Sequence, residues 1–195
     1  MDKKGPKKIF GVLGYPLQTT FSPAMHNAAF EALKMNSIYF PLPVPPDKIK
    51  SVVNALSWLS FSGVNVTVPF KKTVAPLMDR LEGEADFLKA VNTIVIQDGK
   101  MTGYNTDGAG FIKSLKADAS FDPSGKKAVL LGTGGAGEAI AYALAKAGVA
   151  KLILIDQVYE KTAALKKKIS KIADTIYFLL NTLIKYHSLL RIILQ

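Results

Sequence analysis

Lys71 and Asp107 are two residues that could move a proton together. Lys71 follows an apolar run at 64–68, and Asp107 follows a second apolar run at 101–104. Ligands of open α/β sheets bind where strands end, so both side chains are predicted to lie at a ligand site. There a lysine and an aspartate can relay a proton to and from an alcohol oxygen while hydride moves on the carbon. Taken singly, they also fit a surface lysine and a helix-capping aspartate, so both interpretations stay open.

A glycine-rich turn lies between a predicted strand at 128–131 and a predicted helix at 136–147. Its spacing is G-x-G-x-x-G, which in this context predicts a dinucleotide site. The first glycine allows the tight turn, the second lets a pyrophosphate approach the backbone, and the third permits close helix–strand packing. The helix N-terminus would offer amide donors to the phosphates. The alternative is a tight turn without a ligand. The predicted cofactor-binding positions of the turn are Gly132, Gly134, Gly135, Ala136 and Gly137.

Asp156 ends the next predicted strand, at 152–155. A carboxylate at that position bonds the adenosine ribose hydroxyls and repels a 2′-phosphate. The nearest cation after it is Lys161, and no arginine is close by. The sequence therefore predicts that NAD is favoured over NADP, and Asp156 joins the predicted cofactor-binding residues. The alternative is an aspartate that caps the following helix.

Apolar runs alternate with helical patterns along the chain, which predicts an α/β fold. The polar stretch at 118–126 is the predicted boundary between two domains. Before it, residues 1–118 are expected to form an N-terminal α/β domain that contains Lys71 and Asp107 and has a hairpin around Asp98-Gly99. After it, residues 125–174 form a partial Rossmann domain, a doubly wound parallel sheet.

The apolar tail at 175–195 is predicted to be an amphipathic helix that covers an exposed sheet, although a non-native tail also fits. The run does not predict a membrane span, because polar residues interrupt it within the length that a span requires.

Composition limits the classes of function. The hydrophobic fraction of 49% supports a buried core, and the absence of cysteine excludes disulfides and thiolate nucleophiles. His26 has no second histidine nearby, so no metal site is predicted. The net charge of +10 comes from lysines near both ends without interleaved aromatic residues. This pattern does not predict a nucleic-acid partner, but it does favour anionic small molecules. No signal-peptide core follows the charged N-terminus, so we expect a cytoplasmic protein, and its oligomeric state stays open.

Five blocks of sequence together resemble the shikimate dehydrogenase family. The resemblance implies an N-terminal substrate domain, a Rossmann domain, a cleft between them, and reversible reduction of 3-dehydroshikimate to shikimate. It also implies that Lys71 and Asp107 are the catalytic pair. The matched blocks are Ser22-Pro23-Ala24-Met25-His26-Asn27, residues 65–71, Ala90-Val91-Asn92-Thr93, Asn105-Thr106-Asp107-Gly108 and residues 132–137. The positions that would hold the substrate are Thr20, Ser22, Thr67 and Asn92, where Thr20 replaces the family's usual serine.

Two departures from the family affect the expected function. Asp156-Gln157-Val158 stands where NADP-dependent members have Asn-Arg-Thr, and it resembles NAD-using quinate/shikimate dehydrogenases. Quinate therefore becomes a possible substrate. The family also continues with a helix that returns a substrate-binding glutamine, and residues 175–195 do not match it. The alternative function is thus a truncated, non-catalytic relative that keeps weak substrate binding.

Overall fold

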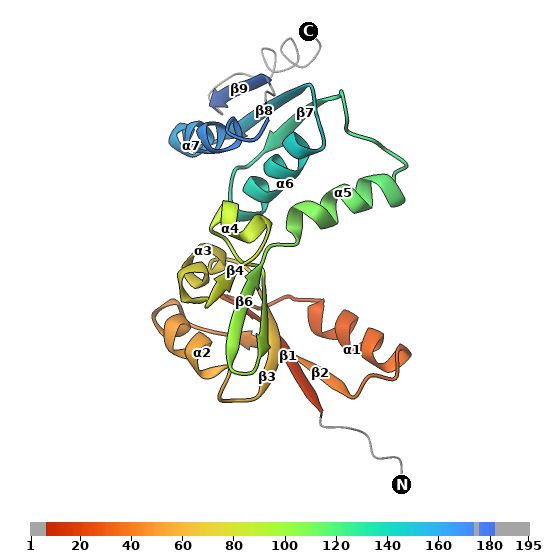
Figure 1. The fold of residues 1–195 in the computed structure, drawn as a ribbon, viewed down its shortest axis with the longest axis vertical. Helices are drawn as coiled ribbons and strands as arrows, with labels where there is room; N and C mark the ends of the chain where they lie inside the picture. Colours follow the sequence, from red (N-terminus) through yellow and green to blue (C-terminus); the bar gives the residue numbers. More distant parts are fainter. Residues whose placement is uncertain (1–6, 174–175, 182–195) are drawn as a thin grey trace. The chain divides into compact units, whose positions relative to one another are not determined.

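The structure is a computed structural model that describes residues 7–173 and 176–181 (Figure 1). It divides into two compact units, Met1–Thr106 and Asp107–Gln195. Each unit has its own hydrophobic core. The α/β fold predicted from the sequence is confirmed, but the first unit ends at Thr106 rather than at residue 118. The reason is that Phe111 and Ile112 of the following helix pack into the core of the second unit.

Among the described residues, the first unit contains a six-stranded mixed sheet of order β2-β1-β3-β5-β6-β4. Strand β1 pairs in parallel with β2 and β3, whereas β5 pairs antiparallel with β3 and β6. Asp98 and Gly99 both have positive φ and close the predicted β5–β6 hairpin, which is therefore confirmed. The strands are β1 Lys8–Gly14, β2 Ser37–Pro43, β3 Phe61–Val66, β4 Arg80–Leu81, β5 Thr93–Gln97 and β6 Lys100–Tyr104.

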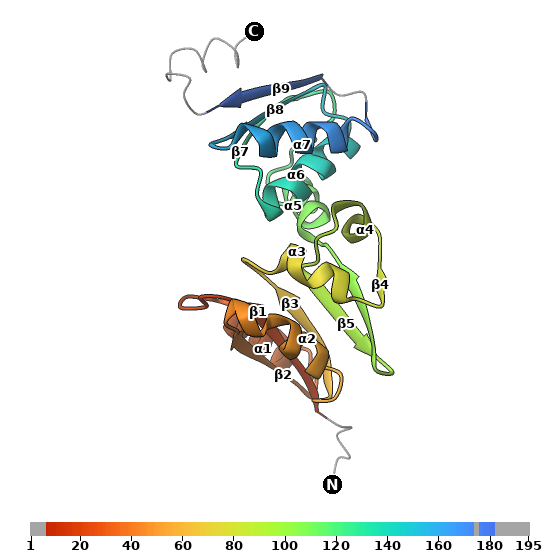
Figure 2. The ribbon, with the colours of Figure 1, turned by 90° about the vertical axis from the view of Figure 1, so that its left-hand side faces the viewer.

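Helices lie on both faces of this sheet. Figures 1 and 2 show α1 on one face and α2 on the other. Alternation along β1 explains the arrangement, since Phe10 contacts Phe30 of α1 while Leu13 joins the core formed with Val53 of α2 and Val74 of α3. The helices of this unit are α1 Ser22–Ala32, η1 Pro46–Lys48, α2 Ile49–Ala55, α3 Lys71–Val74, η2 Ala75–Leu77 and α4 Glu84–Leu88.

In the part of the chain that the structure describes, the second unit has a parallel sheet of order β7-β8-β9. The strands follow one another across the sheet in chain order, so right-handed crossovers place the connecting helices on the same face of the sheet. Leu144, Leu152, Leu154 and Leu165 form the core on that face, where Phe111 of α5 also packs. The elements are α5 Asp107–Ala117, β7 Lys127–Leu131, α6 Gly135–Lys146, β8 Lys151–Asp156, α7 Tyr159–Ile169 and β9 Ile176–Asn181.

The third strand of this sheet corrects the prediction for the tail. Ile176–Asn181 pairs in parallel with Lys151–Asp156 instead of forming an amphipathic helix. A short apolar run does not by its periodicity distinguish a strand from a helix, and here the edge of β8 supplies backbone hydrogen-bond partners. The rest of the predicted tail, residues 182–195, lies outside the described residues. No helix among the described residues is long and apolar enough to cross a membrane.

Candidate active site

A pocket of about 280 Å³ lies in the first unit where the loop after β1 meets the end of β3. It brings together Thr20, Ser22 and Thr67, three of the residues predicted to hold the substrate. Ser22 is the first residue of α1, and its N–H donates to Thr20 Oγ1 over 3.3 Å. The lining therefore offers several hydroxyl groups to one small ligand. The lining residues are Val12, Tyr15, Pro16, Leu17, Thr19, Thr20, Ser22, Thr67 and Val68.

Backbone hydrogen bonds hold the two sides of this pocket together. The Thr67 N–H donates to the Leu13 carbonyl over 2.8 Å, and the Tyr15 N–H donates to the Val68 carbonyl over 3.1 Å. Gly14 lies between them, and a Cβ there would stand 2.5 Å from Thr67 Cγ2. A side chain at position 14 would therefore force the Thr67 side chain, which lines the pocket, to move.

Asn92, the fourth predicted substrate-binding residue, lies beside the pocket and does not line it. Its carbonyl accepts a hydrogen bond of 2.8 Å from the N–H of Val66, the residue before Thr67. Its side chain is 9% exposed, and its Oδ1 accepts hydrogen bonds from the Thr93 hydroxyl (2.9 Å) and the Thr106 N–H (3.0 Å). The orientation of this amide is therefore fixed by its neighbours.

Lys71 and Asp107, the predicted proton-transfer pair, each begin a helix and belong to different units. Lys71 starts α3, and its carbonyl accepts a 2.8 Å hydrogen bond from the N–H of Val91, next to Asn92. Asp107 starts α5 and directly follows Thr106. The Lys71 backbone is thus bonded to the residue before Asn92, and Asp107 follows the residue whose N–H donates to Asn92 Oδ1.

The glycine-rich turn connects β7 to α6 as predicted. Gly132 has φ +90° and donates its N–H to the Ile155 carbonyl over 2.7 Å. A Cβ at Gly137 would lie 2.1 Å from the Gly132 carbonyl oxygen, so the helix packs tightly against the turn. A Cβ at Gly134 would meet no described atom within 4 Å, which leaves open space beside the start of α6 at Gly135. The turn therefore fits a dinucleotide pyrophosphate, whose oxygens the backbone amides can reach.

Asp156 bonds the glycine-rich turn rather than standing free at the strand end. Its Oδ2 accepts hydrogen bonds from the Thr133 N–H (2.7 Å) and hydroxyl (2.9 Å), and its Oδ1 accepts one from the Val158 N–H (3.1 Å). The Thr133 amide, followed by the Val158 amide and the Thr133 hydroxyl, lowers the pKa of Asp156 from 3.8 to about 2. Both carboxylate oxygens of Asp156 thus accept hydrogen bonds from residues of the same chain.

Replacing Asp156 with asparagine is expected to destabilise the protein at neutral pH but much less in acid. Because the pKa of Asp156 is lower in the fold than in the unfolded chain, its carboxylate stabilises the fold above pH 3.8. That contribution is lost as the pH falls from 3.8 towards about 2. Urea unfolding of parent and variant at several pH values measures the difference.

The surface variant Asp98→Asn, which also removes one carboxylate, is the control for this experiment. A free energy difference between parent and Asp156→Asn that stays constant with pH would contradict the assignment.

The sequence interpretation missed the polar residues that surround Asn92. Thr93 and Thr106 hold its side chain, and Asn65 contacts both its carbonyl and Thr93. One available signal was that Asn65 interrupts the apolar residues of β3, because a polar residue in a buried strand requires partners.

Comparison with known proteins agrees with this arrangement. The family model of the shikimate dehydrogenase substrate binding domain matches residues 12–94. A curated shikimate dehydrogenase (NADP(+)) of Desulforamulus reducens is 45% identical over 171 residues, which are 88% of this chain and 59% of that relative. The chain therefore spans less than two thirds of that relative's length.

Solved structures show the same fold. Shikimate 5-dehydrogenase of Listeria monocytogenes, in complex with shikimate and NAD, matches with a TM-score of 0.86 at 32% identity, over 95% of this chain and 64% of that one. The enzyme of Thermus thermophilus, in complex with NADP(H) and shikimate, matches with a TM-score of 0.79 at 30% identity, over 90% of this chain and 68% of that one.

The predicted preference for NAD over NADP is wrong. Curated relatives from four organisms, at 37–45% identity, are named for NADP(+). The physical reason lies at Asp156, whose carboxylate bonds Thr133 and Val158. A carboxylate that already accepts hydrogen bonds within the chain binds the ribose hydroxyls less effectively than the prediction from its position at the strand end assumes.

The fold, the matched sequence blocks and the residues of the pocket all point to the same family. The matched substrate-binding region includes Ser22, Thr67 and Asn92, and the glycine-rich turn leaves open space at Gly134 beside the start of α6. The chain belongs to the shikimate dehydrogenase family.

Proposed function

We propose that the protein interconverts shikimate and 3-dehydroshikimate with NADP as cofactor. The observation that carries this proposal is the pocket that gathers Thr20, Ser22 and Thr67 at the edge of the first sheet. Its volume of about 280 Å³ lies near the lower limit of ligand pockets, roughly 300 Å³, which suits a single-ring acid. Shikimate carries several hydroxyl groups and a carboxylate, which hydroxyl and amide side chains can bind.

Each site residue has a role in this proposal. Thr20, Ser22 and Thr67 bind polar groups of the substrate, and Asn92 orients a further one. Lys71 and Asp107 take the proton from the alcohol oxygen during oxidation and return it during reduction.

The turn between β7 and α6 would hold the cofactor through its backbone amides, with Gly134 leaving room for the pyrophosphate. The chemistry that a nicotinamide dinucleotide would supply there is hydride transfer to and from the carbinol carbon of the substrate.

The experiment is a steady-state assay of this chain with shikimate and NADP, followed by the absorbance of NADPH. We expect NADPH formation that saturates with shikimate and that is faster than with quinate. Calorimetric titration with shikimate is run in parallel. Binding of shikimate without turnover would support the alternative of a relative that only binds the substrate. The proposal would be refuted by a chain that shows no binding and no turnover.

A further inference from the structure

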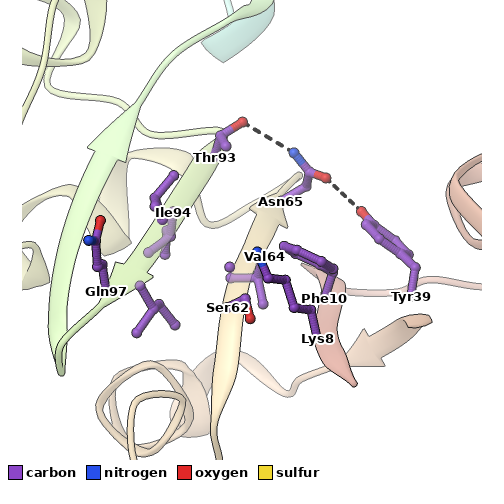
Figure 3. A pocket seen from close by; sticks show the side chains of 12 residues that line it. Lys8, Phe10, Tyr39, Ser62, Val64, Asn65, Thr93, Ile94 and Gln97 are labelled. Atoms are coloured by element: carbon purple, nitrogen blue, oxygen red, sulfur yellow. Dashed lines mark hydrogen bonds between the residues drawn. The ribbon is translucent and has the colours of Figure 1, made fainter. Parts of the chain in front are cut away.

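A chain of side-chain hydrogen bonds crosses the sheet of the first unit and ends at Asn92. The Tyr39 hydroxyl of β2 donates to Asn65 Oδ1 over 2.7 Å, and Asn65 Nδ2 donates to Thr93 Oγ1 over 3.2 Å (Figure 3). The Thr93 hydroxyl then donates to Asn92 Oδ1 over 2.9 Å. Three strands thus contribute one connected set of donors and acceptors, which we call the Tyr39–Asn65–Thr93 relay.

The relay has a direction, which follows from what each group can donate. Burial raises the pKa of Tyr39 to about 12, so its hydroxyl keeps its proton and donates. Asn65 Nδ2 also donates to the Asn92 carbonyl over 3.4 Å, and because a carbonyl can only accept, the Asn65 NH₂ group faces Asn92 and Thr93 while Oδ1 faces Tyr39. The Asn65 NH₂ occupies a lone pair of the Thr93 oxygen, so the Thr93 proton points to Asn92 Oδ1. The Asn92 amide cannot flip without losing this donor.

The start of the relay is held in place by α1. The His26 ring stacks on the Tyr39 ring, with a centroid distance of 4.4 Å and an interplanar angle of 16°. The Asn27 side chain makes two hydrogen bonds to the Tyr39 backbone: its Nδ2 donates to the carbonyl, and its Oδ1 accepts from the N–H. Tyr39 is 4% exposed, so its hydroxyl is fixed within the unit.

We propose that Asn65 is a positioning residue that, through Thr93 and together with the Thr106 N–H, holds the orientation of the Asn92 amide, and with it the affinity for the substrate. This inference rests on the proposed function, in which Asn92 orients a substrate group. Asn65 lies away from the hydroxyl-lined pocket and lines a second hollow of about 610 Å³ on the sheet. Its effect on the substrate is therefore indirect.

The test compares substitutions that alter the relay with little change in shape. Thr93→Val removes the hydroxyl, Thr93→Ser restores it, and Asn65→Asp replaces the NH₂ donor with an acceptor. With aspartate at 65, the Thr93 proton is drawn away from Asn92. Thr102→Val is the matched control, because Thr102 is a half-buried threonine on β6 of the same sheet that does not belong to the relay.

Calorimetric titration with shikimate and steady-state kinetics give the readouts. We expect Thr93→Val and Asn65→Asp to raise the dissociation constant and KM for shikimate by about three- to tenfold, the effect of one hydrogen bond. The KM for NADP and the kcat should change less than about twofold, because losing a contact made equally in the ground state and the transition state raises the KM for shikimate and leaves kcat unchanged. Thr93→Ser should recover the parent affinity, and Thr102→Val should match the parent.

Two outcomes separate this inference from the proposed function. Parent-like shikimate affinity in both Thr93→Val and Asn65→Asp, with the parent chain binding shikimate, would overturn the inference alone. A parent chain that binds no shikimate would overturn the proposed function and this inference with it. An equal loss of shikimate and NADP affinity would show a merely structural effect and also count against it.

Discussion

Replacing Lys71 with alanine or Asp107 with asparagine is expected to lower kcat for shikimate oxidation by about a hundredfold or more. Either change removes one partner of the pair that we propose to move the alcohol proton. The fold should persist, because each residue begins a helix and neither belongs to a hydrophobic core. The measurement is kcat at saturating shikimate and NADP, together with thermal unfolding of each variant.

The neighbouring residue Lys72 supplies the control for this prediction. It follows Lys71 in α3 and carries the same charge, so Lys72→Ala removes a lysine from the same helix. We expect Lys72→Ala to retain most of the parent turnover. Near-parental rates for Lys71→Ala or Asp107→Asn would remove that residue from the catalytic pair.

Replacing Gly137 with alanine is expected to weaken NADP binding by more than tenfold and to destabilise the second unit by about 1–3 kcal/mol. The new Cβ would stand 2.1 Å from the Gly132 carbonyl oxygen, which is backbone and cannot rotate away. The turn must therefore move, and the amides that face the pyrophosphate move with it. Calorimetric titration with NADP and with shikimate measures the two affinities.

Gly110→Ala is the matched control, because Gly110 lies in α5 of the same unit and a Cβ there meets no described atom within 4 Å. Alanine in a helix is favoured over glycine by roughly 0.5–1 kcal/mol, so this variant should be slightly more stable. Shikimate binding should survive in both variants, since the hydroxyl-lined pocket belongs to the first unit. Unchanged NADP affinity in Gly137→Ala would contradict the role assigned to the turn.

The features that the sequence predicted well are those that depend on local chemistry. The turn at Gly132 and Gly137 could be placed because glycine spacing between a strand and a helix has a direct steric meaning. The hairpin at Asp98-Gly99 could be placed because that dipeptide favours positive φ. Thr20, Ser22 and Thr67 were chosen by family resemblance rather than local chemistry; they line one pocket, and their binding of substrate stays a prediction.

The features that the sequence did not predict depend on tertiary contacts. The helix at Asp107–Ala117 follows the first sheet directly, yet Phe111 packs in the core of the second unit. Ile176–Asn181 became a strand because the edge of β8 was available to it. Asp156 was interpreted by its position at a strand end, whereas its bonds to Thr133 become visible in three dimensions. The connection from Asn65 through Thr93 to Asn92 likewise joins residues on different strands.

The most direct test of the account is titration of this chain with shikimate, followed residue by residue in proton–nitrogen correlation NMR spectra. The account predicts saturable shifts for the backbone amides of Thr20, Ser22 and Thr67 and for the side-chain amide of Asn92. Thr67→Val, which keeps the shape of the side chain but removes its hydroxyl, should weaken the binding. Saturable shifts that leave these four residues unchanged, or no shifts at all, would contradict the assignment of this pocket as the shikimate site.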